Sequence, residues 1–460
     1  MPIHNAIDGR DIDYDQMDEE MREFQAVIKD TVFAEKAPDA GGQIEFEHTL
    51  IAVLKLADEF SEVRFQISLT CAESLENVTV QVVAAAPLAI LESDHKAGSI
   101  SLVPWSIDVV GICARNGTVY VPDVVVNATY RLGSELRVVS HRIALPLATF
   151  CTPVEPDGEE LAMQYTIAAQ QSASIADVLG QDFPGLDPGH SVAQFALCDG
   201  STVTIESPEG SGAYRIAGRE LGSIWLLAQA VCKGLTAHFR GKQIELKLVS
   251  NREDDDATKK SGNLGSLRAG QTNMLLMEEY LLVLEERFQR RTEVDVVCNE
   301  LTAQAKQIAA IQKQLLIRFR DKTPTPLKHL DDLMVTAHES LMVLTEHAVT
   351  AKERLTAVSS RLAAATLGLL LLAKLSFKLG KDAYELLEAA FGPYSIHSTD
   401  QGWEERTDAA LLELLKRSLA NKAHDPNSIL AFSAPKDIAK LKQHVVKLCA
   451  KLGDGLQLQL

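Results

Sequence analysis

Residues 361–375 read RLAAATLGLLLLAKL, with no charge between Arg361 and Lys374. In a chain that is 23% charged, such a run indicates a membrane span, a signal remnant or a helix buried by other elements. The uncharged stretch would cover about 18 Å as a helix, well short of the ~30 Å hydrocarbon core of a bilayer. We therefore expect a buried helix and no transmembrane segment.

The same run completes a longer repeat. From Leu330 onward, apolar residues recur at alternating steps of four and three, which predicts a supercoiled seam of six heptads. The break DKTPTPL at 321–327 separates this helix from another long helical pattern, so we expect an antiparallel hairpin. We expect the seam to serve packing and assembly; its residues are Leu330, Met334, Ala337, Leu341, Leu344, Ala348, Ala351, Leu355, Val358, Leu362, Ala365, Leu369 and Leu372.

Upstream, the period of the hydrophobic pattern changes to two. VRFQISLT at 63–70 is one of seven or so short alternating runs, which favour an antiparallel β-sandwich of immunoglobulin-like size. Asn116-Gly117 lies between two such runs and predicts a two-residue hairpin. Between 160 and 250 the order of patterns predicts three strands, a helix and a fourth strand.

The predicted fold is multidomain α+β. It comprises a linker helix at 1–40, an immunoglobulin-like, adaptin-appendage-like β-sandwich at 41–156 and a small α/β platform at 157–252. A polar linker at 253–270 follows, then a long antiparallel α-helical hairpin or coiled coil at 271–380 and a C-terminal helical domain at 381–460. Within the hairpin we expect one helix at 272–290 and a second at 292–321 before the break.

Composition narrows the classes of function. The net charge is −18 and the isoelectric point about 5.2, which argues against nucleic acid as a partner. Seven scattered cysteines without a CxxC pair favour a reducing compartment, and the acidic N-terminus lacks the apolar segment of a signal peptide. The sequence therefore predicts a cytoplasmic protein.

No motif in the sequence indicates catalysis or metal binding. Asp11, Asp13 and Asp15 resemble the start of a calcium loop, but the glycine and glutamate that complete one are missing. His338 and His347 are nine residues apart and do not share a helix face, so they do not form a zinc site. We expect no catalytic residue, no cofactor, no metal and no small-molecule substrate.

Several segments carry a family resemblance, in order along nearly the whole chain. They are LPLATFCTPVEP (145–156), YRIAGRELGSIWLL (214–227), RFRDKTPTPLKHLDDLM (318–334), LLEAAFGP (386–393), GWEERTDAALLELLKRSL (402–419) and APKDIAKLKQHVVKLCAKL (434–452). They resemble the Bardet–Biedl syndrome protein 9 family, the parathyroid-hormone-responsive subunits of the BBSome. The resemblance is to the family's C-terminal part, without its N-terminal β-propeller, so the chain is expected to be a fragment or a shortened gene model.

The resemblance implies a non-enzymatic scaffold subunit of the BBSome, a coat-like complex for ciliary trafficking, protein transport and cilium assembly. Its implied partners are other BBSome subunits, both tetratricopeptide-repeat and propeller–appendage members. The implied location is cytoplasmic, at the cilium, basal body and ciliary membrane, as a peripheral complex. Two alternatives stay open: an adaptor-appendage-type binder of cargo or accessory proteins outside the BBSome, and a homodimeric coiled-coil tether.

Overall fold

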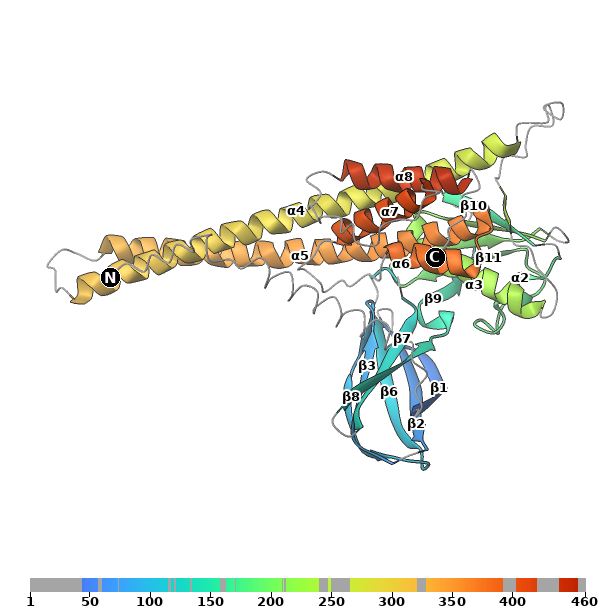
Figure 1. Ribbon diagram of the computed structural model, residues 1–460, viewed down its shortest axis with the longest axis horizontal. Coiled ribbons are helices and arrows are strands. Elements are labelled where there is room, and N and C mark those ends of the chain that lie inside the picture. The colour runs from blue at the N-terminus through green and yellow to red at the C-terminus, as the bar shows by residue number, and fades with distance from the viewer. Residues whose placement is uncertain are drawn as a thin grey trace, which may run out of the picture.

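The computed structural model describes most of the chain from residue 44 onward. It covers 44–391, 403–419 and 438–453, apart from gaps at 57–59, 73, 115–116, 120, 133–134, 158–162, 170, 209, 211, 240–246, 250–264 and 321–327. The predicted linker helix at 1–40 and most of the predicted polar linker at 253–270 lie outside these residues. The fold is multidomain α+β, with a sandwich, a platform, a long hairpin and a terminal helical bundle (Figure 1).

Two four-stranded antiparallel sheets form the sandwich. One sheet has the order β1-β2-β6-β4, with strands β1 (Ile44–Leu56), β2 (Phe60–Cys71), β6 (Trp105–Ala114) and β4 (Leu88–Ile90). The other has the order β5-β3-β7-β8, with strands β5 (Asp94–Ile100), β3 (Leu75–Ala84), β7 (Asp123–Leu132) and β8 (Glu135–Ala144). In β2, Phe65 and Ile67 are buried between the sheets while Arg64 and Gln66 are exposed, as the two-residue period requires.

The segment with Gly117 is a crossover, so the prediction of a two-residue hairpin is wrong. β6 and β7 belong to different sheets and are separated by eight residues. A Cβ on Gly117 would lie 2.7 Å from the Cβ of Pro87, so glycine is needed for this close approach. The segment also joins two domains: Cys198 Sγ donates to the Gly117 carbonyl at 3.3 Å, and Trp225 Nε1 donates to the Val119 carbonyl at 3.1 Å.

The platform is a six-stranded antiparallel sheet with the order β14-β10-β13-β12-β11-β9. Its strands are β9 (Cys151–Val154), β10 (Met163–Ala168), β11 (Val192–Leu197), β12 (Thr202–Glu206), β13 (Ala213–Gly218) and β14 (Lys247–Val249). A short helix α2 (Ile175–Leu179) and the longer α3 (Leu221–His238) complete it, and a 3-10 turn at Leu147–Thr149 leads in from the sandwich. The sequence did not predict β9, β10 or α2. β9 pairs with β11, so the sheet takes in a strand from the range predicted for the sandwich.

Two long helices form the hairpin. α4 (Gly265–Arg320) runs outward and α5 (Lys328–Phe377) returns beside it, and both project beyond the sheets (Figure 1). The prediction of two helices, at 272–290 and 292–321, is wrong because α4 is continuous. Nothing between residues 271 and 320 breaks a helix, since this stretch contains neither glycine nor proline.

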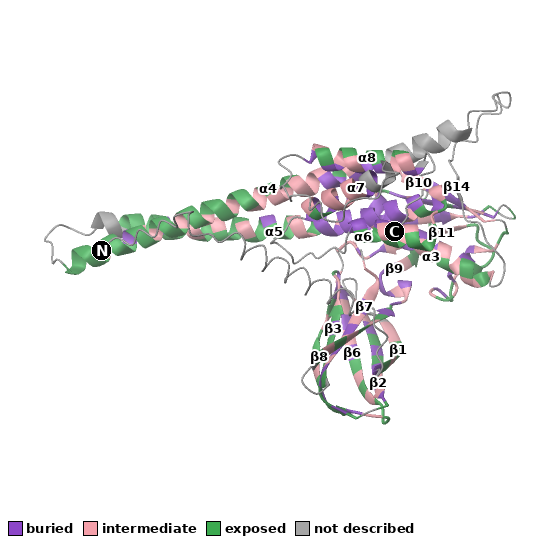
Figure 2. Ribbon diagram, viewed as in Figure 1, coloured by how far each residue is buried: buried purple, intermediate pink, exposed green. Residues whose placement is uncertain are grey.

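The remaining helices cover the base of the hairpin, and Figure 2 shows the densest burial there. They are α6 (Lys381–Phe391), α7 (Trp403–Leu419) and α8 (Ala439–Gly453). The apolar run that begins after Arg361 is buried here. By length and composition the stretch Asp332–Phe377 could span a membrane, but 67% of its most apolar window is buried inside the protein. A core helix passes the same test, so the stretch is weak evidence for a span.

Candidate functional site

The predicted seam lines the face of α5 that meets α4. Within 332–350, Met334, Ala337, Leu341, Leu344 and Ala348 are buried or half-buried, and every other residue is exposed. The seam then continues into the core: Ala351, Val358, Leu362, Ala365, Leu369 and Leu372 are buried and Leu355 is half-buried. Leu330 lies on α5, but its side chain is outside the described residues. The outer half of the hairpin is thus a two-helix coil, and the inner half is a core.

The matching seam on α4 has the same spacing. Its residues, buried or half-buried in the otherwise exposed outer half, are Val294, Val297, Leu301, Gln304, Ile308, Ile311 and Leu315. Sequence reasoning passed over Gln304 because it is polar. Its amide Nε2 donates to the backbone carbonyl of Ala337 at 3.1 Å, across the coil. A polar seam residue of this kind favours one register of the two helices.

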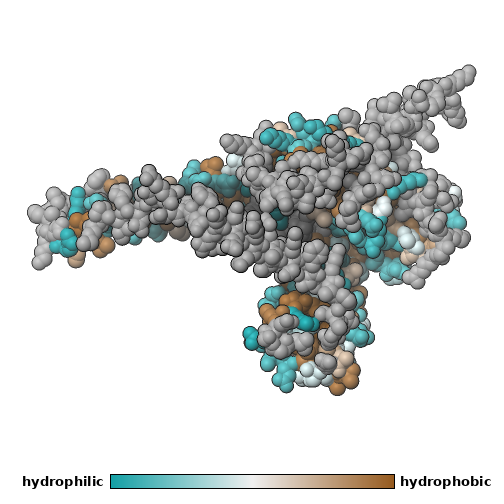
Figure 3. Space-filling model, viewed as in Figure 1, coloured by the Kyte–Doolittle hydropathy of each residue, from teal (hydrophilic) through white to brown (hydrophobic). Residues whose placement is uncertain are grey.

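Outside the seam, the arm exposes large apolar side chains to solvent. Phe319 is 78% exposed and Leu316 is 70% exposed near the free end. Figure 3 shows hydrophobic atoms among hydrophilic ones toward this end of the arm. Further exposed members are Val296, Ile317, Leu333, Val335, Met342, Val343 and Val349. Apolar surface on this scale is typical of a protein interaction site.

At the base, the platform helix α3 packs directly on α5. A Cβ on Gly222 would lie 3.4 Å from the Cβ of Ala364, and one on Gly368 would lie 3.1 Å from Leu221 Cδ1. Small residues on both helices therefore bring the two backbones close together. Leu367 and Leu371, which lie off the seam, are half-buried against the core. α6 and α8 also contact α5, and the contact between α3 and α5 was not predicted from the sequence.

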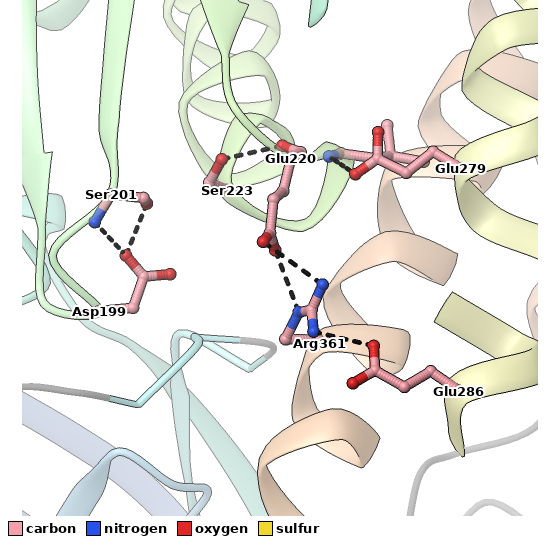
Figure 4. A network of polar contacts seen from close by, with 8 residues as sticks. Asp199, Ser201, Glu220, Ser223, Glu279, Glu286 and Arg361 are labelled. Carbon is pink, nitrogen blue, oxygen red and sulfur yellow. Dashed lines mark hydrogen bonds and ion pairs between the residues drawn. The ribbon is translucent and has the colours of Figure 1, made fainter. Parts of the chain in front are cut away.

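Arg361 links the platform to both arms of the hairpin (Figure 4). Its Nε lies 3.1 Å from Glu220 Oε2, at the start of α3, and its Nη1 lies 3.1 Å from Glu286 Oε2 on α4. Beside this contact, Glu279 Oε1 on α4 accepts the backbone N–H of Leu221 at 3.0 Å. Burial raises the pKa of Glu279, although this hydrogen bond opposes the shift. The joint is therefore held by polar contacts from three elements.

A buried carboxylate fastens the terminal bundle to α4. Glu404, at the start of α7, has no exposed surface, and its two oxygens contact the guanidinium groups of Arg287 and Arg291. Burial lowers the pKa of Arg291, but the carboxylates of Glu404, Glu405 and Asp295 together more than offset this effect, and the pKa is raised. Next to it, Trp403 Nε1 donates to the Phe391 carbonyl at 2.7 Å, and the Arg287 guanidinium lies 5.7 Å from the Trp403 ring centre. On α8, Lys442 Nζ lies 2.6 Å from Glu285 Oε2.

The described residues contain no group of three or more His, Cys, Asp or Glu side chains arranged to hold a metal ion. His338, Glu339, Glu346 and His347 are all exposed on the arm. Asp11, Asp13 and Asp15 lie outside the described residues. What the structure brings together is a set of helix–helix contacts and an exposed arm.

Comparisons with known proteins point to one kind of relative. A family model described as the PTHB1 hairpin matches residues 274–377, and a second, the PTHB1 C-terminal helix bundle, matches 379–452. These ranges coincide with α4 and α5 and with α6 to α8. Protein PTHB1 of Mus musculus is 28% identical over 98% of this chain and 51% of its own length. The PTHB1 proteins of Homo sapiens and Xenopus laevis are each 26% identical, over 98% and 99% of this chain and 51% and 54% of their own lengths.

The chain is therefore similar to PTHB1 from end to end. It spans about half the length of these relatives, so what a whole PTHB1 binds is not thereby assigned to it. The findings also correct the family name inferred from the sequence: the relatives and both family models are named PTHB1, not Bardet–Biedl syndrome protein 9. The two names denote the same protein, so the correction concerns the name alone.

Proposed function

We propose that this chain is a non-enzymatic scaffold subunit of the BBSome, acting in the trafficking of membrane proteins to and from cilia through protein–protein contacts. One observation carries the proposal. The outer half of the hairpin has a complete two-helix seam yet exposes apolar side chains such as Phe319 and Leu316. A helical arm that is apolar on its outside is suited to binding another protein.

The similarity to PTHB1 supports the same proposal, since it covers both the hairpin and the bundle. Other BBSome subunits, with tetratricopeptide repeats or with propeller and appendage domains, would be the partners. The chain would reach the basal body, the cilium and the ciliary membrane as part of a peripheral complex formed in the cytoplasm.

Affinity purification of the chain from ciliated cells, with quantitative mass spectrometry, tests the proposal. We expect the other BBSome subunits in stoichiometric amounts. Their absence from the purified material would overturn the proposal.

The appendage-like sandwich and platform favour a second candidate, a binder of cargo or accessory proteins outside the BBSome. Appendages recruit peptides to exposed domain surfaces, and the sandwich exposes Leu102 and Val103 in the loop after β5. In the same purification, endocytic accessory proteins recovered without BBSome subunits would support this candidate.

A further inference from the structure

The outer half of α4 carries a second heptad stripe beside the seam. Its members, here called the outer stripe, recur at steps of four and three, are uncharged and are all exposed: Cys298, Thr302, Ala305, Ala309, Gln312, Leu316 and Phe319. Between Leu301 and Ile317, the charged residues of α4 are Lys306 and Lys313 alone. A helix face that is only solvated is normally rich in charges, so this face has the composition of a contact surface.

α5 continues the apolar surface on the same side. Val335, Met342 and Val349 are exposed and directly follow seam residues of α5, as Thr302, Ala309 and Leu316 directly follow seam residues of α4. His338, Thr345 and Lys352 follow the intervening seam residues of α5 and are also exposed, so this side of α5 is partly polar. Residues that directly precede seam residues face each other on the opposite side. On that opposite side, which faces α3, Arg354 of α5 lies 3.7 Å from Glu293 of α4, and Arg361 of α5 bonds to Glu286 of α4. The two rows therefore border one groove along the arm.

The inner end of the outer stripe already receives helices. Continuing the same spacing toward the base leads first to the charged residues Asp295 and Arg291 and then to Phe288, Leu284, Leu281 and Met277. Arg291 bonds to Glu404 of α7, Leu284 is buried, and Met277 lines a small apolar pocket with Cys449 of α8. The face of α4 that α7 and α8 cover at the base therefore continues outward as the exposed outer stripe.

Charged rows of opposite sign flank the groove. Lys306 and Lys313 are exposed beside the stripe on α4, and Glu339 and Glu346 are exposed beside the row on α5. A helix lying in the groove would be stabilised by carboxylates along the edge over α4 and by cations along the edge over α5. Such flanking charges select partner and orientation in helical bundles.

We propose that this groove holds a single amphipathic α-helix of a partner protein, with an acidic edge over α4 and a basic edge over α5. The occupant would turn the outer two-helix coil into a three-helix bundle. The inference rests on the proposed function, because it names the kind of segment that the assembly arm would bind.

A second copy of the chain fits the groove less well. Two arms side by side need their axes about 8–10 Å apart. With both tips pointing the same way, the layers formed by α7 and α8 would lie between the two arms and hold them further apart (Figure 1). With the tips pointing opposite ways, Lys306 and Lys313 of one copy would face the same lysines of the other.

Photo-crosslinking in ciliated cells tests the proposal on the whole chain. A photoreactive amino acid is placed at Ala305 or Ala309 in the stripe or, as a matched control, at Ala303 or Ala310, which are exposed on the same helix but face away from the groove. We expect cross-links from the stripe positions alone, to a heptad-patterned helical peptide of another protein with acidic and basic edges. The proposal would be overturned by cross-links to a second copy or to a peptide without this pattern. It would also be overturned if the control positions cross-linked equally well, or if no cross-links formed.

Two double variants measure the contribution of the groove. Ala305→Glu with Ala309→Glu places carboxylates inside the contact, and we expect about tenfold less recovery of the cross-linked partner. The control variant, Ala303→Glu with Ala310→Glu, should leave recovery of the partner unchanged. An equal reduction of recovery by the two double variants would overturn the inference.

If cross-links of the expected kind form to a protein outside the BBSome, the proposed function fails while the groove stands. If BBSome subunits bind and the stripe variants bind them equally well, the groove fails while the proposed function stands.

Discussion

At the residue scale, Glu404 is the clearest test of how the bundle is held. Its carboxylate is fully buried against Arg287 and Arg291, so Glu404→Ala would remove the counter-charge of Arg287 and leave Arg291 with Glu405 at 3.6 Å. Removing one partner of a buried ion pair costs about 3–5 kcal/mol. We expect hydrogen-exchange protection of the α7 amides to fall by a comparable free energy.

The matched control is Lys381→Ala. It breaks the exposed pair between Lys381 and Glu385, and such pairs contribute less than about 1 kcal/mol. Equal effects of the two substitutions would contradict the account of Glu404.

His141 gives the sandwich a pH dependence. Its Nε2 is buried without a hydrogen-bond partner in the described structure, and its ring stacks on Phe46 with centroids 5.2 Å apart. Burial, with a further contribution from nearby His48, lowers the pKa of His141. As pH falls below about 6.5, the unfolded chain therefore binds a proton at His141 that the folded chain does not yet bind. The free energy of unfolding that neutral His141 contributes is fully present above pH 6.5 and is lost as pH falls through the lowered pKa.

His141→Phe keeps the stacking and removes the titration. We expect the loss of protection in β1 and β8 between pH 7 and pH 5 to be smaller than in the unsubstituted chain. His190→Asn, at an exposed position, serves as control and should leave the profile unchanged. An identical acid response in the His141 variant would refute this explanation.

At the element scale, the close contact between α3 and α5 depends on small residues. Ala364→Leu would push α3 away at Gly222, and overpacking of this kind costs about 1–3 kcal/mol. Denaturant unfolding measures the change. Ala357→Leu makes the same substitution at an exposed site on the same helix, and we expect it to change the free energy of unfolding by about 0.5 kcal/mol or less. A tolerated Ala364→Leu would show that the contact is not tight.

The sequence predicts elements well where the pattern is local. The seam of α5 is such a case: within 332–350 its four-and-three spacing identifies every buried or half-buried residue, because a two-helix coil buries one stripe and nothing else. Past Val358 the same spacing no longer separates buried from exposed residues, since α3 and the terminal helices cover further faces. Gln304 was passed over because its role depends on the Ala337 carbonyl of the other helix.

The elements missed by sequence reasoning depend on distant partners. β9 is a four-residue strand whose pairing with β11 joins residues about forty positions apart. Gly117 matches a hairpin signal in sequence, but the strands on either side pair in different sheets and the glycine is needed beside Pro87. The polar joint at Arg361 likewise combines residues from α3, α4 and α5 that no local spacing links.

At the scale of the whole molecule, the chain divides into a connected body and a free arm. Gly117 and Val119 tie the sandwich to the platform, Arg361 ties the platform to the hairpin, and Glu404 ties the hairpin to the bundle. Outward of Val297 and Leu344, the described parts of α4 and α5 have only each other as a packing partner. We propose that the body holds the fold together and that the arm binds other proteins.

Replacing residues 298–343 with a short Gly-Ser turn tests this claim most directly. Val297 and Leu344 then close a shortened hairpin, and every contact at the base is left in place. Co-purification of BBSome subunits from ciliated cells is the measurement, with circular dichroism and thermal unfolding of the same protein as the control for folding. We expect a folded body whose recovery of partner subunits falls about tenfold or more. Undiminished recovery by a folded, shortened chain would contradict it.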